Sequence, residues 1–329
     1  MLRVDFSICI PTRNRRIGLE RLLDSILKQT YTDYEVVILD NSDDSETKEL
    51  YESKFKQYKQ ITYHRNNQVL MMGENWNKCI SLSNFSWVKM MHDDDFFSSA
   101  RSLEIIALSI SNSEHKAFTF SYTNVYEGGR MEKVGLSRFV FYLKNFFFFY
   151  VYKDNFIGNP CCLVYHRSCA IQYKNEMRWL VDIDFYMRMR IQGFIIRYIP
   201  KMVINIGISE LQATKAYKHN LAIELTEHQF MAIEFGQIRY YQSYFVFDTH
   251  WRLIRNTNLK EVDLEKYVSN FEFREYLKWI IGKQSQFSNT LLQKKLISGI
   301  LKSWCYIVWW IKKFDVRFGK CRFAKFRNR

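Results

Sequence analysis

Three consecutive carboxylates, Asp93–Asp95, follow directly on the apolar run Phe85–Met91. Like charges repel at short range and the stretch His92–Phe96 contains no lysine or arginine, so such a cluster usually needs a cation. Carboxylate oxygens suit Mg²⁺ and Mn²⁺, and Mg²⁺ sites commonly combine one or two carboxylates with the phosphates of a substrate. The triplet therefore predicts a metal site for a nucleotide-diphosphate substrate; the alternative is an acidic turn that faces solvent.

The segments before the triplet alternate between strands and helices. Apolar runs predict strands over Phe6–Ile10, Tyr34–Leu39, Gln60–His64 and Phe85–Met91. Apolar residues recur at helical spacing from Leu19 to about Gln29, and Asn75–Leu82 also has a helical pattern. This alternation is typical of βαβ units, so the sequence predicts an α/β fold with a mainly parallel central sheet.

Polar residues follow three of these strands directly, in the stretches Pro11–Asn14, Asp40–Asp43 and Asp93–Asp95. Functional groups in open α/β sheets gather at the carboxyl ends of the strands, so we expect the three stretches to form one site. The sequence has no Gly-x-Gly-x-x-Gly after the first strand, no Gly-Lys-Ser/Thr loop and no Gly-x-Ser-x-Gly elbow. These absences disfavour a dinucleotide-binding dehydrogenase, a P-loop enzyme and an α/β-hydrolase. A nucleotide would then have to be bound by side chains and a metal ion.

The composition bounds the size and setting of the protein. The chain has 329 residues, 47% of them hydrophobic, which is enough for one large domain or two smaller ones. Its seven cysteines are scattered and lack metal-ligand spacing, which indicates reduced thiols and a cytoplasmic setting. The N-terminal apolar run is short and is followed by arginines, and we interpret it as a first strand rather than a signal peptide.

Positive charge is concentrated near the C-terminal end. Of the formal net charge of +14, +10 falls from Leu291 onward, where eleven basic residues stand against one acid. Apolar residues there fall close to one helical face, with lysines at its margins: Ile297, Ile300, Leu301, Trp304, Val308 and Ile311. The stretch is too short to span a membrane, but a basic helix with tryptophan on its apolar face suits an anionic membrane surface. The alternatives are a helix packed on its own domain and a nucleic-acid-binding tail, although no nucleic-acid motif is present.

An ordered series of motifs runs from residue 7 to about residue 97. They are Ser7–Asn14, Ser25–Tyr31, Tyr34–Ser42, and Asn75–Asn77 ahead of Val88–Asp95. In this order they resemble the family 2 glycosyltransferases, inverting enzymes with the GT-A fold (the Rossmann-like fold of nucleotide-diphospho-sugar transferases). Asn75–Asn77 with the triplet resembles the subgroup that builds bacterial surface polysaccharides such as O-antigen and capsule. Further on, Gly158–Pro160 resembles the acceptor-side segment.

The segment Trp179–Arg188 resembles the helix that carries the catalytic base in this family. The resemblance assigns the base to Asp182, although Val181 replaces the usual glutamate before it. A carboxylate is an adequate base where it lies within hydrogen-bonding reach of the acceptor hydroxyl. The alternatives are that Asp182 only caps or solvates the helix and that Asp184 or Glu176 is the base.

The resemblance also implies a metal between the acidic triplet and the diphosphate of the donor. Asp95 is the expected direct ligand, with Asp93 in support, and the expected cofactor is Mn²⁺ or Mg²⁺. Many relatives carry a further histidine near the metal, but the corresponding stretch Asn205–Thr214 has none. His92 adjoins the triplet, and we interpret it as a structural hydrogen-bonding residue rather than a ligand.

The nucleotide-sugar-binding residues implied by the resemblance lie mainly on the three loops. Asp40 is expected to accept a hydrogen bond from the base or the ribose, and its alternative role is that of a turn residue. Arginines of the first loop can contact phosphate or face solvent. The full set is Pro11, Thr12, Arg13, Asn14, Asp40, Ser42, Asn75, Asp93 and Asp94.

We expect a GT-A domain over residues 1–235 and a helical, basic region over residues 236–329. The expected activity is inverting transfer from a nucleotide sugar, a UDP-sugar first of all, to a polyprenyl-diphosphate-linked glycan in surface-polysaccharide synthesis. The aromatic run Phe139–Tyr152 is expected to be core, or else to contact that lipid. The resemblance implies an enzyme that is peripheral on the cytoplasmic face of a bacterial membrane and binds no nucleic acid. A catalytically silent scaffold and a nucleic-acid-binding protein are the competing hypotheses.

Overall fold

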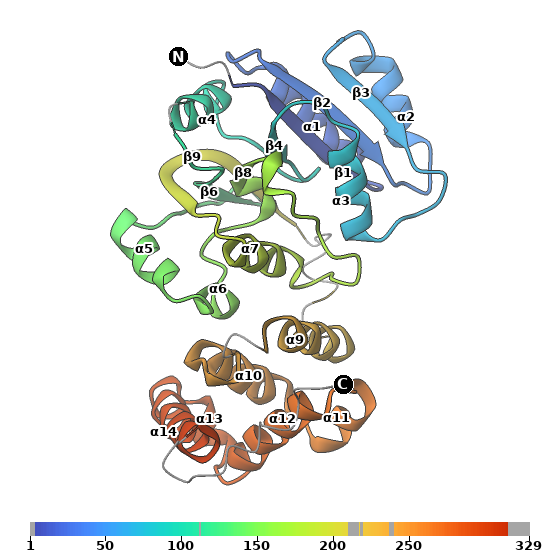
Figure 1. Cartoon of the computed structure of the whole chain (residues 1–329). Coiled ribbons are helices and arrows are strands. Elements are labelled where there is room, and N and C mark those ends of the chain that lie inside the picture. The colour runs from blue at the N-terminus through green and yellow to red at the C-terminus, as the bar shows by residue number, and fades with distance from the viewer. Residues whose placement is uncertain (1–3, 112, 210–216, 218–219, 237–239, 315–329) are drawn as a thin grey trace, which may run out of the picture. The chain divides into compact units, whose positions relative to one another are not determined.

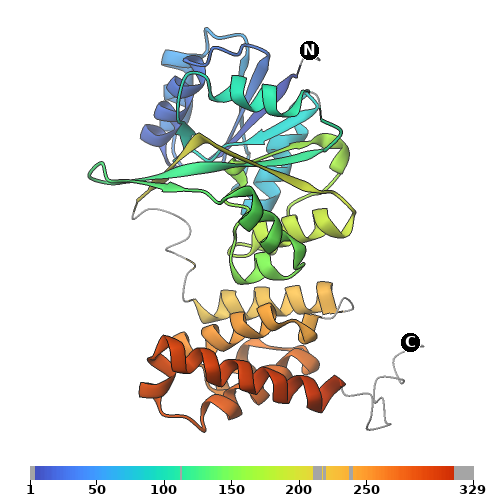
Figure 2. The same cartoon turned by 90° about the vertical axis from the view of Figure 1, so that its left-hand side faces the viewer.

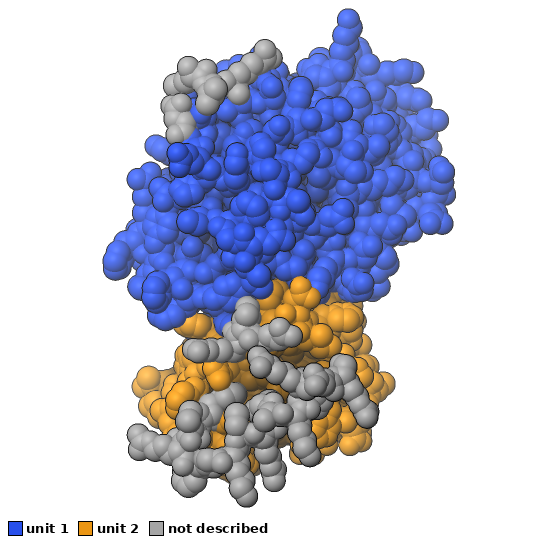
Figure 3. All heavy atoms as spheres, in the orientation of Figure 1, with its two compact units in different colours: residues 1–218 blue, residues 219–329 orange. Residues whose placement is uncertain are grey.

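The computed structural model describes residues 4–111, 113–209, 217, 220–236 and 240–314. The chain divides into two compact units, residues 1–218 and residues 219–329, which Figure 3 colours separately. Strands and helices alternate in the first unit, and the described part of the second unit is helical (Figure 1).

The first unit is built on a single mixed sheet. Its strands are β1 (Phe6–Thr12), β2 (Tyr34–Asp40), β3 (Ile61–Arg65), β4 (Trp87–Met90), β5 (Phe96–Phe97), β6 (Ala117–Tyr126), β7 (Met131–Val134), β8 (Leu163–His166) and β9 (Ile196–Ile208). They lie in the order β3-β2-β1-β4-β8-β6-β9-β5, and β7 pairs with β6. β1 to β4 are parallel to one another, as are β6 and β9, which run side by side (Figure 2). The predicted α/β fold is confirmed, and antiparallel pairs appear where β8 and β5 join their neighbours.

Helices cover this sheet and present apolar faces to it. They are α1 (Arg16–Leu27), α2 (Glu46–Leu50), α3 (Met72–Ser81), α4 (Ser102–Ile110), α5 (Arg138–Phe146), α6 (Tyr150–Lys153) and α7 (Val181–Ile191). The predicted α1 is confirmed, with Leu19, Leu22, Leu23 and Ile26 buried. α3 begins three residues before the predicted Asn75. Gly73 of this helix lies against the backbone of Lys174, so that an added Cβ would be 2.5 Å from the Lys174 carbonyl oxygen.

The described helices of the second unit are α9 (Leu221–Phe235), α10 (Tyr244–Thr257), α11 (Glu261–Tyr267), α12 (Phe271–Gln284), α13 (Asn289–Gln293) and α14 (Lys295–Phe314). Four of them begin at a polar side chain that accepts a hydrogen bond from the backbone N–H three residues on, the usual way to satisfy the first turn. These caps are Asn220, Ser243, Asn270 and Ser288. Among the described residues, no helix is long and apolar enough to cross a membrane.

The unit boundary and the face of the C-terminal helix both differ from the sequence-based expectations. The division at residue 218 lies upstream of the predicted 235, because α9 packs against α11 within the helical unit. Of the six apolar residues predicted to share one face of α14, Ile300, Trp304 and Ile311 are exposed as expected. The other three, Ile297, Leu301 and Val308, are partly buried. Another face of the helix, which includes Cys305 and Trp309, is buried. The exposed apolar stripe therefore lies on a different side of the helix from the predicted one.

Candidate functional site

The acidic triplet lies on the loop between β4 and β5, and two glycines allow the chain to close around it. An added Cβ on Gly18 of α1 would be 2.4 Å from the carbonyl oxygen of Asp93, and one on Gly207 of β9 would be 2.3 Å from that of Asp94. Arg21 donates a hydrogen bond to the same Asp94 carbonyl. The loop backbone is therefore held from two sides, by a helix near the start of the chain and by the last strand.

Arg15 of the loop before α1 supplies a positive charge to the triplet. Its guanidinium lies 2.6 Å from Asp94 Oδ2 and 3.4 Å from Asp93 Oδ1. Burial lowers the pKa of Arg15, but the two carboxylates outweigh burial and raise it above its usual value. The stretch His92–Phe96 has no basic residue of its own, and Arg15 from a distant part of the sequence supplies one. The sequence left open two roles for the arginines of the first loop, and Arg15 has a third, pairing with the acidic triplet.

Asp93 is tied to the first loop. Its Oδ2 accepts hydrogen bonds from Thr12 Oγ1 at 2.8 Å and from the Arg13 backbone N–H at 3.3 Å. Burial raises the pKa of Asp93 to about 6, although Arg15 acts in the opposite direction. These contacts join the loops after β1 and β4, as the sequence predicted. They also occupy the Asp93 carboxylate that the sequence analysis offered as a supporting metal ligand.

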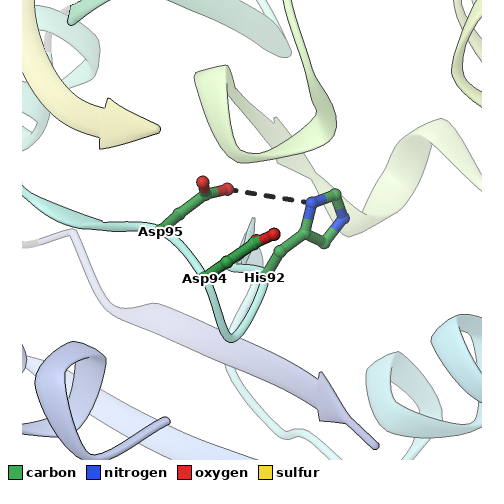
Figure 4. A group of neighbouring side chains, drawn as sticks. All are labelled: His92, Asp94 and Asp95. Carbon is green, nitrogen blue, oxygen red and sulfur yellow. Dashed lines mark ion pairs between the residues drawn. The ribbon is translucent and has the colours of Figure 1, made fainter. Parts of the chain in front are cut away.

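His92, Asp94 and Asp95 form a group whose ligand atoms all lie within 4.8 Å of one another. Figure 4 shows the two carboxylates and the imidazole converging from one loop, with His92 Nδ1 3.7 Å from Asp95 Oδ2. Asp95 Oδ2 and His92 Nε2 are buried and accept or donate no hydrogen bond. Burial raises the pKa of Asp95 and lowers that of His92. The unpartnered Asp95 oxygen, with the His92 imidazole and the Asp94 carboxylate beside it, fits a divalent cation.

His92 belongs to this ligand group, although the sequence analysis interpreted it as a structural residue and not as a metal ligand. Its ring packs against Trp76 of α3, with the centroids 5.0 Å apart, and this contact turns the imidazole toward the carboxylates. The downstream stretch that lacks the expected histidine contributes a backbone group instead, because Gly207 N–H donates to Asp95 Oδ1 at 3.3 Å. Residues 210–216 of that stretch lie outside the described residues.

The loops after β1 and β2 are bonded to each other. Asn14 adopts a left-handed backbone conformation, with φ of 53°, and its N–H donates to Ser42 Oγ at 2.8 Å. Its side-chain amide bonds to Asp43 in both directions, at 3.0 Å each. Arg13 forms an exposed ion pair with Asp43 at 3.1 Å. Pro11 is buried at the end of β1. The predicted meeting of these loops is confirmed, whereas contact with a nucleotide stays a prediction.

Asp40 makes the contacts of a turn residue. Its side chain is fully buried, Oδ1 accepts from the Ser42 N–H at 2.8 Å, and Oδ2 accepts from the Tyr63 hydroxyl at 2.6 Å. Asn75 is also engaged within the protein, since its Oδ1 accepts from Asn66 Nδ2 at 2.8 Å. Both side chains are therefore engaged within the protein, and their predicted ligand contacts remain predictions.

Asp182 lies in the first turn of α7 and is half-buried. Its Oδ2 accepts a hydrogen bond from Asn155 Nδ2 at 2.6 Å, and its Oδ1 accepts from the Ile183 N–H at 2.8 Å. The amide of Asn155 is oriented in turn, because its Oδ1 accepts from the Gly158 N–H at 3.2 Å. Gly158 has a φ of +97°, a backbone conformation that favours glycine. This conformation explains why the motif Gly158–Pro160 begins with glycine.

The two alternative bases have other surroundings. Asp184 is fully buried and paired with Arg188 at 2.5 Å, one turn along the same helix. Glu176 is exposed in the loop before α7. A buried carboxylate neutralised by an arginine cannot meet an acceptor hydroxyl without losing its partner. The geometry therefore favours Asp182 over Asp184.

The segment from Asn155 to Cys162 connects Asp182 to the acidic loop. The Gly158 carbonyl accepts from the Tyr186 hydroxyl of α7 at 2.9 Å, and a Cβ on Gly158 would contact Cys162 Sγ. Burial and the neighbouring Cys161 thiol raise the pKa of the Asp95 carboxyl group. Sequence reasoning did not single out Asn155, although its position three residues before the motif was the available signal.

Comparison with known proteins places this geometry in a family. The family model for glycosyl transferase family 2 matches residues 7–173, about half of the chain. The chain belongs to glycosyl transferase family 2. Asp182 and Gly207 both lie beyond the matched residues.

Two curated relatives match over parts of their length. An uncharacterised protein of Mycobacterium tuberculosis is 23% identical over 202 residues, 57% of this chain and 62% of its own. The GalNAc(5)-diNAcBac-PP-undecaprenol beta-1,3-glucosyltransferase of Campylobacter jejuni is 30% identical over 131 residues, 39% of each chain. The chain therefore spans less than two thirds of either relative.

Solved structures share the fold at low identity. TarS of S. aureus in complex with UDP-GlcNAc has a TM-score of 0.55 and 16% identity, covering 94% of this chain and 81% of its own. The mannosyltransferase PcManGT from Pyrobaculum calidifontis, in complex with GDP-Man and Mn²⁺, has a TM-score of 0.57 and 14% identity, covering 95% and 89%. At these identities the likeness shows the GT-A fold.

Proposed function

We propose that this chain is an inverting glycosyltransferase that moves a sugar from a nucleotide-sugar donor to a hydroxyl group of a lipid-linked glycan. The observation that carries the proposal is the ligand group of His92, Asp94 and the buried Asp95 at the carboxyl end of β4, in a family 2 chain. Solved neighbours of the same fold bind UDP-GlcNAc and GDP-Man. A UDP-sugar is the first donor to test.

His92, Asp94 and Asp95 are the residues that would hold Mn²⁺ or Mg²⁺. When bound there, the cation supplies Lewis-acid stabilisation of the negative charge on the leaving diphosphate. An imidazole among the ligands favours Mn²⁺ over Mg²⁺, because Mg²⁺ prefers oxygen ligands alone. Arg15 and Thr12 fix Asp93 and Asp94 in place beside the group, so that the carboxylates are ordered before the donor arrives.

Asp182 takes the proton from the acceptor hydroxyl as that oxygen attacks the anomeric carbon of the donor. The new bond joins the acceptor oxygen to this carbon. The bond from the carbon to the diphosphate oxygen breaks, and the nucleoside diphosphate leaves with the electron pair. Attack from the side opposite to the leaving group inverts the anomeric configuration. The Asn155 amide holds the Asp182 carboxylate in one orientation for the proton transfer.

The proposed acceptor is a polyprenyl-diphosphate-linked glycan of a surface polysaccharide such as O-antigen or capsule. The Campylobacter relative is named for action on an undecaprenol-linked substrate. In this chain α5 and the residues after it expose aromatic and aliphatic side chains, including Phe139, Leu143 and Phe146, whereas Phe141 and Tyr152 of the same aromatic run are buried. An apolar surface of this kind suits the lipid part of such an acceptor. The proposed location is the cytoplasmic face of the membrane.

Release of nucleotide from a panel of UDP-, GDP- and dTDP-sugars tests the proposal. Wild type, Asp95→Asn and the control Asp44→Asn, an exposed acid on a neighbouring loop, are compared with Mn²⁺, Mg²⁺ or EDTA. We expect slow hydrolysis of one donor that EDTA and Asp95→Asn abolish and Asp44→Asn leaves intact. Absence of nucleotide binding with either metal would reject the transferase proposal in favour of a silent scaffold.

The stereochemistry is tested separately. Once an acceptor is found, the anomeric configuration of the product is read by NMR against that of the donor. Inversion is expected. Retention of configuration would show that Asp182 does not act as the base of a single displacement.

A further inference from the structure

We infer that the outward face of α14 binds the surface of an anionic phospholipid bilayer, with the helix lying in the plane of the interface. The inference deepens the proposed function, on which it rests for its setting, by naming the element and the residues that meet the membrane. It concerns the second unit alone and does not depend on which sugar is transferred.

The inward face of α14 fixes the helix to its own unit. Cys305 and Trp309 are buried. Trp309 Nε1 donates to the Tyr241 carbonyl at 3.0 Å, and the Tyr306 hydroxyl donates to the Gln242 carbonyl at 2.6 Å. Lys302 forms an ion pair with the buried Asp248 of α10. A helix with these anchors holds its opposite face in a defined orientation.

The outward face is a continuous apolar stripe. Its residues are between 48% and 80% exposed and recur every three or four positions, as one helix face requires. They are Leu296, Ile300, Trp304, Ile307 and Ile311. The stripe spans residues 296–311 of this helix, so it runs for about 23 Å. Figure 2 shows α14 in red, lying across other helices of its unit.

The charges around this stripe indicate which kind of partner binds it. α14 contains four lysines and no acid, and Lys294, Lys295, Lys312 and Lys313 are exposed at its two ends. In the sequence, the residues after it add six basic residues and one acid. A second copy of the same stripe would bring like charges together, and nucleic acid would leave the apolar centre in water. An anionic bilayer accepts both the apolar side chains and the lysines.

Vesicle flotation tests the inference with the full-length chain. Phosphatidylcholine vesicles with and without phosphatidylglycerol are compared for wild type, for Trp304→Glu/Ile307→Glu, and for the matched control Ile233→Glu/Val262→Glu. The control places the same two charges at exposed apolar positions of α9 and α11. We expect wild type and the control to float with anionic vesicles. The stripe variant should bind at least tenfold more weakly, and all three should bind neutral vesicles poorly.

Further measurements separate the inference from its rivals and from the proposed function. Circular dichroism and thermal melting check that both double variants fold, and donor hydrolysis without vesicles should be equal in all three proteins. Equal vesicle binding by wild type and the stripe variant would overturn the inference. So would a wild-type dimer, seen by sedimentation, that the stripe variant dissociates while neither protein floats. Loss of donor hydrolysis in wild type would instead count against the proposed function.

Discussion

Replacing Gly207 with alanine tests whether β9 must lie against the acidic loop. The new Cβ would be 2.3 Å from the Asp94 carbonyl oxygen and 2.9 Å from the guanidinium of Arg21, where ordinary contacts begin at 3.4 Å. The guanidinium ends a flexible side chain and can move, but the carbonyl belongs to the backbone. We therefore expect the loop to retreat by about 1 Å, at a cost of about 1–3 kcal/mol in stability.

That retreat displaces the candidate ligands. It lengthens the bond from the Gly207 N–H to Asp95 and moves Asp94 and Asp95 relative to His92. Metal sites tolerate ligand displacements of about 0.2 Å, and a misplacement of about 1 Å can cost about a hundredfold in rate. We expect Gly207→Ala to bind Mn²⁺ at least about tenfold more weakly and to hydrolyse the donor about a hundredfold more slowly.

Gly73→Ala is the matched control for strain. Its Cβ would clash with the Lys174 carbonyl at 2.5 Å, in the same unit but at a contact that does not involve the backbone of the acidic loop. Mn²⁺ affinity is measured by calorimetry for both variants, with thermal melting to match their stability losses. The reasoning is refuted if Gly207→Ala keeps wild-type Mn²⁺ affinity, or if Gly73→Ala loses as much.

Three further predictions follow from named contacts. Asn155→Ala removes a hydrogen bond to the Asp182 carboxylate, worth about 1.5–3 kcal/mol, so kcat for transfer should fall roughly 10- to 100-fold with donor KM unchanged; a change confined to KM would contradict this. His92→Gln should weaken Mn²⁺ binding roughly tenfold and Mg²⁺ binding less, and equal losses in calorimetric titrations would show that the imidazole is not a ligand. Burial lowers the pKa of His228 to about 3 and that of His250 well below its usual value. The unfolded chain binds protons at these histidines below about pH 6.5 and the folded chain does not, so acid destabilises the second unit between pH 6.5 and 5, by about 1.5 kcal/mol from His228 alone. Urea unfolding at several pH values measures this slope, and a flat profile would exclude it.

The sequence was sufficient for the parts of the fold that depend on local pattern. The strands and α1 follow from apolar runs and helical spacing, and the three polar stretches meet because parallel strands end at one edge of the sheet. The base position rests on a motif with one mismatch and stays a prediction; the structure adds that Asn155 donates a hydrogen bond to the Asp182 carboxylate.

The remaining features depend on contacts between distant segments. Arg15 meets Asp94 across a separation of 79 residues, and neither residue indicates the other by pattern. The orientation of His92 depends on packing against Trp76. The place of α9 in the helical unit depends on which neighbour buries its apolar face. Each of these is a tertiary effect that a single sequence read locally does not specify.

The closure of the acidic loop by β9 also has a consequence for synthesis of the chain. Asp95 and Gly207 are separated by 112 residues, and translation adds about 5–20 residues per second, so the triplet is made roughly 6–22 s before the strand that seals it. During that interval the nascent chain already contains Arg15, which precedes the acids and carries the one positive charge that pairs with Asp93 and Asp94 in the folded structure. The ion pair of the acidic loop with Arg15 therefore needs only residues made before that interval, whereas the contact with Gly207 must wait until β9 has been made.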